Sequence, residues 1–174
     1  MKISKMHALL PILTSLIGLS SYSYSNELLR NFNDWSAFVG KTSGTTFCYL
    51  GSEAQKSEGR YTKRGNVLFL VTHRSTKKSV AVINFRAGYK FKKNSSALIT
   101  IAKKKFKLFT ESDNGWAKDS KSDVAIIKAM KQGSIMIIEG TSSRGTKTKD
   151  IFSLRGFTAA YNAASKACRI KNNS

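Results

Sequence analysis

The stretch Val67-Leu68-Phe69-Leu70-Val71 decides the fold class of this 174-residue chain. A short, continuously apolar run of this kind is typical of a β-strand covered on both faces. Other short runs rich in β-branched and aromatic side chains lie on either side of it, with glycine, serine and asparagine between them. They occupy residues 32–39, 45–50, 80–85, 98–101, 106–110, 135–138 and 150–154. This spacing predicts a small antiparallel β-sandwich or barrel.

A first helix is predicted at residues 122–132. Ser122 is suited to cap its start, Asp123 complements the positive end of a helix, and Gly133 is suited to close it. Apolar side chains recur on one face at three-residue intervals: Val124, Ile127 and Met130.

A second helix is predicted at residues 157–168, which carry one apolar stripe. The stripe consists of Phe157, Ala160, Tyr161, Ala164 and Cys168. This spacing turns Cys168 towards the core of the domain. The chain is therefore expected to be mainly β, with about two short helices.

Residues 1–25 have the composition of an export signal and are predicted to be a signal peptide. Lys2 and Lys5 give it a positive start, and the apolar stretch that follows is too short and too interrupted to span a bilayer stably. Ser23 and Ser25 suit the positions three residues and one residue before a cleavage site. A buried N-terminal helix or an uncleaved anchor is the alternative interpretation.

Residues 26–174 are predicted to form a single domain, because no repeat or Pro-rich linker divides them. The whole chain has a formal net charge of +20, and removal of the leader leaves 28 basic and 10 acidic residues, a net charge of +18. The content of 41% hydrophobic and 10% aromatic residues excludes a disordered polyelectrolyte. No run of about 18 apolar residues occurs, so no ordinary membrane span is predicted.

Cys48 and Cys168 are the two cysteines of the chain. In an oxidising compartment a lone pair is most simply a structural disulfide. The closed loop of roughly 120 residues would contribute about 4–5 kcal/mol in the chain-entropy model. Two reduced, buried thiols are the alternative.

The order of short motifs carries a family resemblance. The second half contains Ala129-Met130-Lys131-Gln132-Gly133, then Gly140-Thr141-Ser142-Ser143-Arg144-Gly145-Thr146, and then Asp150-Ile151-Phe152-Ser153-Leu154-Arg155-Gly156-Phe157, running on to Ala160 and Cys168. The first half supplies Trp35, Cys48-Tyr49, Val71-Thr72-His73-Arg74, Gly88-Tyr89, Leu108-Phe109-Thr110 and Trp116-Ala117. In this order the motifs resemble the invasion-associated locus B (IalB) family of exported alphaproteobacterial proteins. Arg74-Ser75 departs from the family pattern, which has a proline at this point.

The resemblance implies an immunoglobulin-like antiparallel β-sandwich. It also implies a location in the periplasm, at the outer membrane or outside the cell, and an association with host-cell invasion and virulence in pathogenic members. It implies no known chemistry, so no catalytic, cofactor-binding or metal-binding residue is carried over. We therefore expect a protein that is not an enzyme and needs no cofactor.

The residue types that carry chemistry are scarce. His73 is the only histidine after the leader, which excludes a two-histidine ribonuclease site and a histidine-rich zinc site. A histidine at a strand end more often makes a structural hydrogen bond than acts as a base. Residues 140–145 lack the Gly-Lys-Ser/Thr ending of a phosphate loop and are interpreted as a hairpin turn. The acidic residues that cluster locally lack the spacing of a calcium loop and are interpreted as solvated: Glu111, Asp113, Asp119 and Asp123.

Two groups of lysines stand out, and members of each alternate with apolar residues, a period that on a strand places the lysines on one face. They are Lys90, Lys92 and Lys93, followed by Lys103, Lys104, Lys105 and Lys107. The net charge surrounds the domain with a positive field. These seven lysines are predicted to bind an anionic envelope or host-cell surface. Biased genome composition with no specific partner is an alternative explanation of the charge.

Three other functions are weighed against this one. Nucleic acid is a weaker candidate because export separates the protein from it and no recognition motif is present. A structural or chaperone-like periplasmic protein would bind other envelope proteins through exposed strand edges. An unrecognised hydrolase would require a pocket that gathers His73 with acidic residues.

Overall fold

The computed structural model describes residues 25–42, 45–74 and 81–169, and within these ranges the chain forms eleven strands and two helices. The predicted leader lies outside the described residues except for Ser25, which begins the first strand. The strands are β1 (Ser25–Phe32), β2 (Trp35–Thr42), β3 (Thr45–Glu53), β4 (Lys56–Gly59), β5 (Leu68–Arg74), β6 (Val82–Arg86), β7 (Ser96–Ile101), β8 (Lys104–Glu111), β9 (Asn114–Trp116), β10 (Ile135–Thr141) and β11 (Lys147–Ser153). The helices are α1 (Ser120–Gln132) and α2 (Phe157–Ala167).

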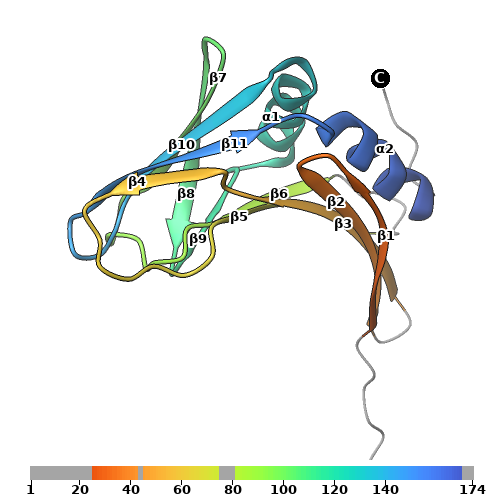
Figure 1. Ribbon diagram of the computed structural model, residues 1–174, viewed down its shortest axis with the longest axis horizontal. Helices are drawn as coiled ribbons and strands as arrows, with labels where there is room; N and C mark the ends of the chain where they lie inside the picture. Colours follow the sequence, from red (N-terminus) through yellow and green to blue (C-terminus); the bar gives the residue numbers. More distant parts are fainter. Residues whose placement is uncertain (1–24, 43–44, 75–80, 170–174) are drawn as a thin grey trace, which may run out of the picture.

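The strands form one antiparallel sheet in the order β1-β2-β3-β5-β6-β9-β8-β7-β10-β11-β4. The sheet bends strongly, so that β10 and β11 lie over β5 and β6 (Figure 1). Phe152 of β11 meets Phe69 of β5 and Phe85 of β6 edge-on, at ring-centroid distances of 6.1 and 6.3 Å. These strands are not neighbours in the sheet order, so the two halves of the sheet face each other across a core. The predicted antiparallel β-sandwich with two helices is confirmed, and both layers belong to one continuous sheet.

The apolar stretch at residues 67–71 supplies the centre of this core, as part of β5 and the residue before it. Val67, Phe69 and Val71 are buried, because alternate side chains of a strand point to the same face. Leu68 and Leu70 are only half-buried on the outer face. The expectation of a strand covered on both faces is therefore wrong for the outer side, although β5 does lie between two other strands, β3 and β6.

Helix α1 starts two residues earlier than the sequence predicts. Its N-cap is Asp119, whose carboxylate accepts a hydrogen bond from the backbone N–H of Ser122 at 2.8 Å, so Ser122 is not the cap. Val124, expected on the buried face, is 56% exposed. Its place towards the core is taken by Asp123, whose carboxylate accepts a hydrogen bond from the backbone N–H of Ile83 in β6. Burial raises the pKa of Asp123.

Helix α2 packs on the β1–β2–β3 end of the sheet (Figure 1). Phe157 at its start meets Trp35 of β2 with the ring centroids 4.9 Å apart. The chain enters the helix through Gly156, which has a φ of 93°, and a Cβ at this position would overlap the carbonyl oxygen of Phe32. Glycine is therefore required at this close approach of helix and sheet.

Candidate functional site

Three connections meet beside one end of the sheet and enclose a pocket of about 510 Å³. They are the loop between β4 and β5, the segment that follows β6, and the hairpin turn between β10 and β11. Figure 1 shows these connections together at the left of the molecule. The pocket is within the size range of small-molecule sites in proteins.

A buried ion pair lies directly behind the pocket, and of its two residues only Arg64 belongs to the lining. The guanidinium of Arg64 donates hydrogen bonds from both terminal nitrogens to the two carboxylate oxygens of Asp150, each at 2.7 Å, and from Nε to the carbonyl oxygen of Ala87 at 2.7 Å. The Asp150 side chain is fully buried and that of Arg64 is 4% exposed. Burial of the guanidinium opposes its charge, but the hydrogen bonds and the charge of Asp150 outweigh this effect and raise the pKa of Arg64. The pair is therefore a fixed, internally neutralised support behind the lining.

Two tyrosine rings flank the Arg64 guanidinium. Its central carbon lies 4.7 Å from the ring centre of Tyr89 and 5.4 Å from that of Tyr61, which are cation–π distances. The Tyr89 hydroxyl is hydrogen-bonded to the Thr148 hydroxyl at 2.7 Å. Burial raises the pKa of Tyr89, so this hydroxyl is neutral at physiological pH.

The pocket is rich in cations and has no acidic residue in its lining. The cationic lining residues are Arg60, Lys63, Arg64, Lys90 and Arg144. Of these five lining residues, only Arg64 forms an ion pair with an acidic residue of the described ranges. The other four are exposed and leave the pocket with an uncompensated positive charge.

Hydrogen bonds between the connections make the pocket a preformed structure. The backbone N–H of Gly65 donates to the carbonyl oxygen of Gly88 at 2.9 Å, and that of Ser143 donates to the carbonyl oxygen of Lys90 at 2.7 Å. Gly88 has a φ of 70°, and a Cβ there would overlap the carbonyl oxygen of Gly65. The Thr146 hydroxyl contacts the carbonyl oxygen of Arg60 at 3.4 Å. Each connection is thus tied to the other two.

Sequence reasoning missed most of this pocket and found only Lys90. One available signal was the dense run Arg60-Tyr61-Thr62-Lys63-Arg64 between Gly59 and Gly65. Another was Asp150, an acidic residue in an apolar strand pattern, because a buried carboxylate needs a cationic or hydrogen-bonding partner. Residues 140–145 do form the predicted hairpin turn, yet they also line the pocket with Ser142, Ser143 and Arg144.

The seven lysines predicted to bind anionic surfaces are all exposed, but they do not form one cluster. Lys90, Lys92 and Lys93 precede β7, whereas Lys103 and Lys104 lie at or beside its turn into β8. Lys105 and Lys107 lie opposite Thr100 and Leu98 on the outer face of the β7–β8 hairpin. The first group therefore lies before the start of β7, whereas the second begins at the far end of β7 and runs back along β8 as far as Lys107.

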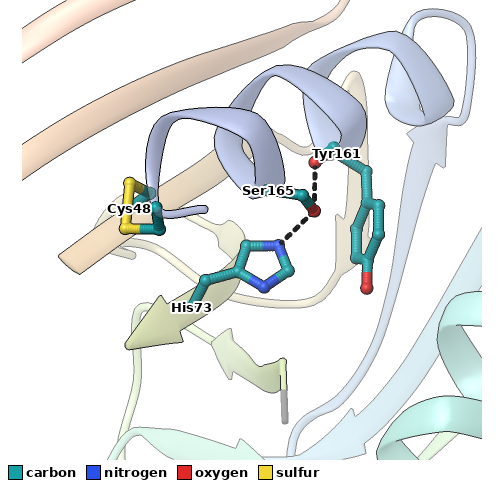
Figure 2. Close-up of a disulfide and its surroundings, with 5 residues drawn as sticks. Cys48, His73, Tyr161 and Ser165 are labelled. Atoms are coloured by element: carbon teal, nitrogen blue, oxygen red, sulfur yellow. Dashed lines mark hydrogen bonds between the residues drawn. A yellow bond between two sulfur atoms is a disulfide. The ribbon is translucent and has the colours of Figure 1, made fainter. Parts of the chain in front are cut away.

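His73 lies in the core beneath α2 (Figure 2). It is fully buried, and its Nε2 lies 3.4 Å from the Ser165 hydroxyl, while Nδ1 has no hydrogen-bond partner. The Tyr161 ring packs edge-on against it, with the ring centroids 4.9 Å apart. Burial, with a smaller contribution from the charge of Lys131, lowers the pKa of His73 to about 4. His73 is a neutral core residue, and the surface pocket does not include it.

Cys48 and Cys168 form a disulfide beside His73, with their Cα atoms 5.8 Å apart (Figure 2). Cys48 lies opposite His73 in the pairing of β3 with β5, and Cys168 caps the end of α2. The bridge therefore fastens α2 to the sheet at the pair of residues that the sequence predicts.

Three of the four acidic residues considered for calcium have separate structural roles. Asp119 caps α1, Asp123 bonds to β6, and Asp113 faces Arg86 at 3.9 Å. In the parts of the chain that the structure describes, no three or more histidine, cysteine or acidic residues gather as metal ligands. Neither of the two helices in the described parts has the length and apolar character to cross a membrane.

Comparisons with known proteins agree with the motif order. The family model described as invasion associated locus B (IalB) protein matches residues 35–165. The crystal structure of invasion associated protein B from Bartonella henselae is similar, with a TM-score of 0.58 and 13% sequence identity over 80% of this chain and 96% of that one. No curated protein matches the sequence. Because the family model covers most of the chain, the protein belongs to the invasion-associated locus B family.

Proposed function

We propose that this chain is an exported, non-enzymatic protein that binds an anionic surface, either of the bacterial envelope or of a host cell. The observation that supports the proposal is that the seven lysines named above are exposed and unpaired with acidic residues. All seven are exposed, and none forms an ion pair with an acidic residue of the described ranges. Their charge is therefore available to an external partner.

The β7–β8 hairpin is the part of the surface best suited to this contact. Lys105 and Lys107 point outwards from β8, and on the same face the ring of Phe109 is 49% exposed and stacks on Trp116 with the centroids 5.4 Å apart. Lysine heads beside exposed aromatic rings suit a surface that is charged outside and apolar beneath. Together these side chains supply both attraction and an anchor.

The non-enzymatic part of the proposal is supported by the burial of His73 in the core. A hydrolase would need this histidine in a pocket with acidic residues, and it is instead enclosed in the core with Ser165 as its partner. The cationic pocket described above includes neither this histidine nor an acidic residue in its lining. Its chemistry supports binding of anions.

Vesicle binding tests the proposal. The triple variant Lys103→Glu, Lys105→Glu and Lys107→Glu should bind phosphatidylglycerol vesicles about a hundredfold more weakly in low salt, at roughly 1 kcal/mol for each lysine near a charged membrane. Neutral phosphatidylcholine vesicles should bind neither protein. Attachment of the wild type that is independent of salt, and unchanged in the variant, would contradict the proposal.

A matched control separates a specific face from net charge. The variant Lys121→Glu, Lys128→Glu and Lys166→Glu makes the same change of charge at exposed positions of the two helices. We expect it to lose only a few-fold in affinity through the weaker long-range field. An equal loss in both triple variants would show that net charge alone, and not the hairpin, attracts the vesicles.

A second candidate function is a chaperone-like protein that binds other envelope proteins. The open sheet supports it, because β1 and β4 are its two edge strands and each pairs on one side only within the described residues. An edge strand offers backbone hydrogen-bond groups to an incoming strand. Cross-linking in the periplasm that captures stable protein partners through β1, without vesicle binding, would favour this function over the first.

A further inference from the structure

We propose that the pocket lined by Arg60, Tyr61, Lys63, Tyr89, Lys90 and Arg144 binds an anionic sugar, that is, a sugar ring that carries sulfate or phosphate groups. The proposal goes beyond surface attachment, because it assigns a defined ligand class to a defined cavity. It does not depend on the lysines of the β7–β8 hairpin.

The charge of the pocket points to an anion with more than one negative group. Arg60, Lys63, Lys90 and Arg144 come from all three connections, and none of them has an ion-pair partner in the described ranges. Arginine side chains match the planar pairs of oxygens on sulfate and phosphate. A single inorganic ion would not fill a cavity of about 510 Å³ or reach cations on all its sides.

The uncharged part of the lining points to a sugar ring. Apart from its cations and glycines, the pocket presents only hydroxyl-bearing residues, among them Tyr61, Ser143 and Thr146, and no aliphatic side chain lines it. Hydroxyl groups suit the hydroxyls of a sugar, and the 39% exposed Tyr61 suits contact with the face of its ring. An acyl chain finds no apolar slot here.

The pocket is built to keep its shape without the ligand. The Arg64–Asp150 pair holds the loop between β4 and β5 against the sheet, and backbone hydrogen bonds join this loop to Gly88 and the Lys90 segment to Ser143. Preorganised donors lose little conformational entropy on binding. The affinity therefore depends on the exposed cations, which can be replaced without altering this frame.

Titration calorimetry of the full chain with four probes tests the ligand class. The probes are a trisulfated heparin disaccharide, glucosamine 1-phosphate, inorganic sulfate and adenosine monophosphate. We expect at least one of the two charged sugars to bind about tenfold more tightly than inorganic sulfate, because ring contacts add to the ionic ones. The stronger of the two distinguishes a sulfated host glycan from a bacterial phosphosugar. Equal affinity for inorganic sulfate, or stronger binding of the nucleotide, overturns the sugar assignment.

Paired variants test the location. Arg60→Gln with Arg144→Gln should weaken binding of the preferred sugar about tenfold or more, since charge-assisted contacts are lost. Lys105→Gln with Lys107→Gln removes the same charge from exposed positions outside the pocket and should change the affinity less than about twofold. An equal loss of sugar affinity in both double variants would show unspecific electrostatic attraction and would contradict binding in the pocket. Because vesicle attachment is measured on the hairpin variants, failure here leaves the proposed surface binding to be judged separately.

A third variant isolates the ring contact. Tyr61→Leu keeps every cation of the pocket but removes the aromatic face and the hydroxyl. We expect it to weaken sugar binding several-fold while leaving the weak binding of inorganic sulfate unchanged. Chemical-shift changes in the wild type should be confined to residues that line the pocket. Unchanged sugar binding in Tyr61→Leu contradicts the role of the ring.

Discussion

The Arg64–Asp150 pair and the His73–Ser165 pair are both buried polar contacts between distant parts of the chain, but they differ in charge and in surroundings. Arg64 and Asp150 are an ion pair directly behind the lining of an open pocket, whose other cations are exposed. His73 and Ser165 form a neutral pair in the core, between α2 and β5 and beside the disulfide. One contact shapes a surface that a ligand can reach, and the other only helps to hold a helix in place.

The difference shows that the residue type most associated with catalysis need not mark the site. His73, the only histidine in the parts of the chain that the structure describes, lies where no substrate can reach it. The accessible pocket is made by arginines, lysines, tyrosines and hydroxyl groups from three connections. A site of this composition is suited to recognition of negative charge.

The largest effect should follow from breaking the ion pair. Asp150→Ala leaves the Arg64 guanidinium buried without its partner, so we expect the free energy of unfolding to fall by about 3–5 kcal/mol. Urea denaturation measures the change. Asp113→Ala is the control, because its contact with Arg86 is long and solvent-exposed, and it should cost less than about 1 kcal/mol. Similar losses in both variants would contradict the special status of the buried pair.

Removing the disulfide should cause the next largest loss of stability, and it acts beside the His73–Ser165 pair. Cys48→Ala with Cys168→Ala releases α2 from the sheet beside His73, and we expect the free energy of unfolding to fall by about 2–4 kcal/mol. Denaturation with and without a reducing agent measures it. The reducing agent should lower the stability of the wild type and leave the double variant unchanged; a wild type indifferent to reduction would exclude a stabilising bridge.

Acid should weaken the protein through His73. Its pKa is about 4 in the folded state, below the ordinary value of 6.5, so the unfolded chain takes up the proton first. The stabilising contribution is complete above pH 6.5 and is lost as the pH falls towards 4, by on the order of 3 kcal/mol in total. His73→Leu should lack this part of the pH dependence. Parallel stability curves for wild type and variant between pH 7 and pH 4 would refute it.

The smallest effect on stability is expected for the exposed cations of the pocket. Arg60→Gln and Arg144→Gln should each change the free energy of unfolding by less than about 0.5 kcal/mol, because neither side chain has an ion-pair partner in the described parts of the chain. Thermal denaturation checks this directly. A large loss of stability in either variant would mean that these residues support the fold, as Arg64 does, and would contradict their assignment as free cations.

The fold could be predicted well from the sequence, for reasons that particular residues make clear. The runs that contain Phe69, Ile83 and Ile99 are strands because their apolar side chains fill one core. The stripe on α2 was correctly predicted because the 3.6-residue period alone fixes which side faces the sheet. Strands β1, β4 and β9 were missed. β1 is an exposed edge strand paired with β2, and the short strands β4 and β9 exist through pairing with β11, β6 and β8.

The site was much less predictable. The sequence shows that Lys90 is charged and lies in a basic stretch. It does not show that most of its neighbours in the pocket come from two other connections. The Arg64–Asp150 pair joins residues 86 positions apart, and no local pattern can specify such a contact. The cap of α1 was misplaced for a smaller reason: Ser122 and Asp119 are both good capping residues, and only the course of the preceding chain decides between them.

The bond between Cys48 and Cys168 also determines how the molecule responds to mechanical force. It spans a sequence separation of 120 residues. If the chain were pulled from its two ends, tension would pass through the sulfur atoms and bypass that whole loop. At about 3.4 Å for each extended residue, the closed loop contains roughly 400 Å of chain that the applied force could not extend. Only the segments outside the loop, including β1 and β2, could be peeled away, so a tethered molecule would yield briefly and then hold.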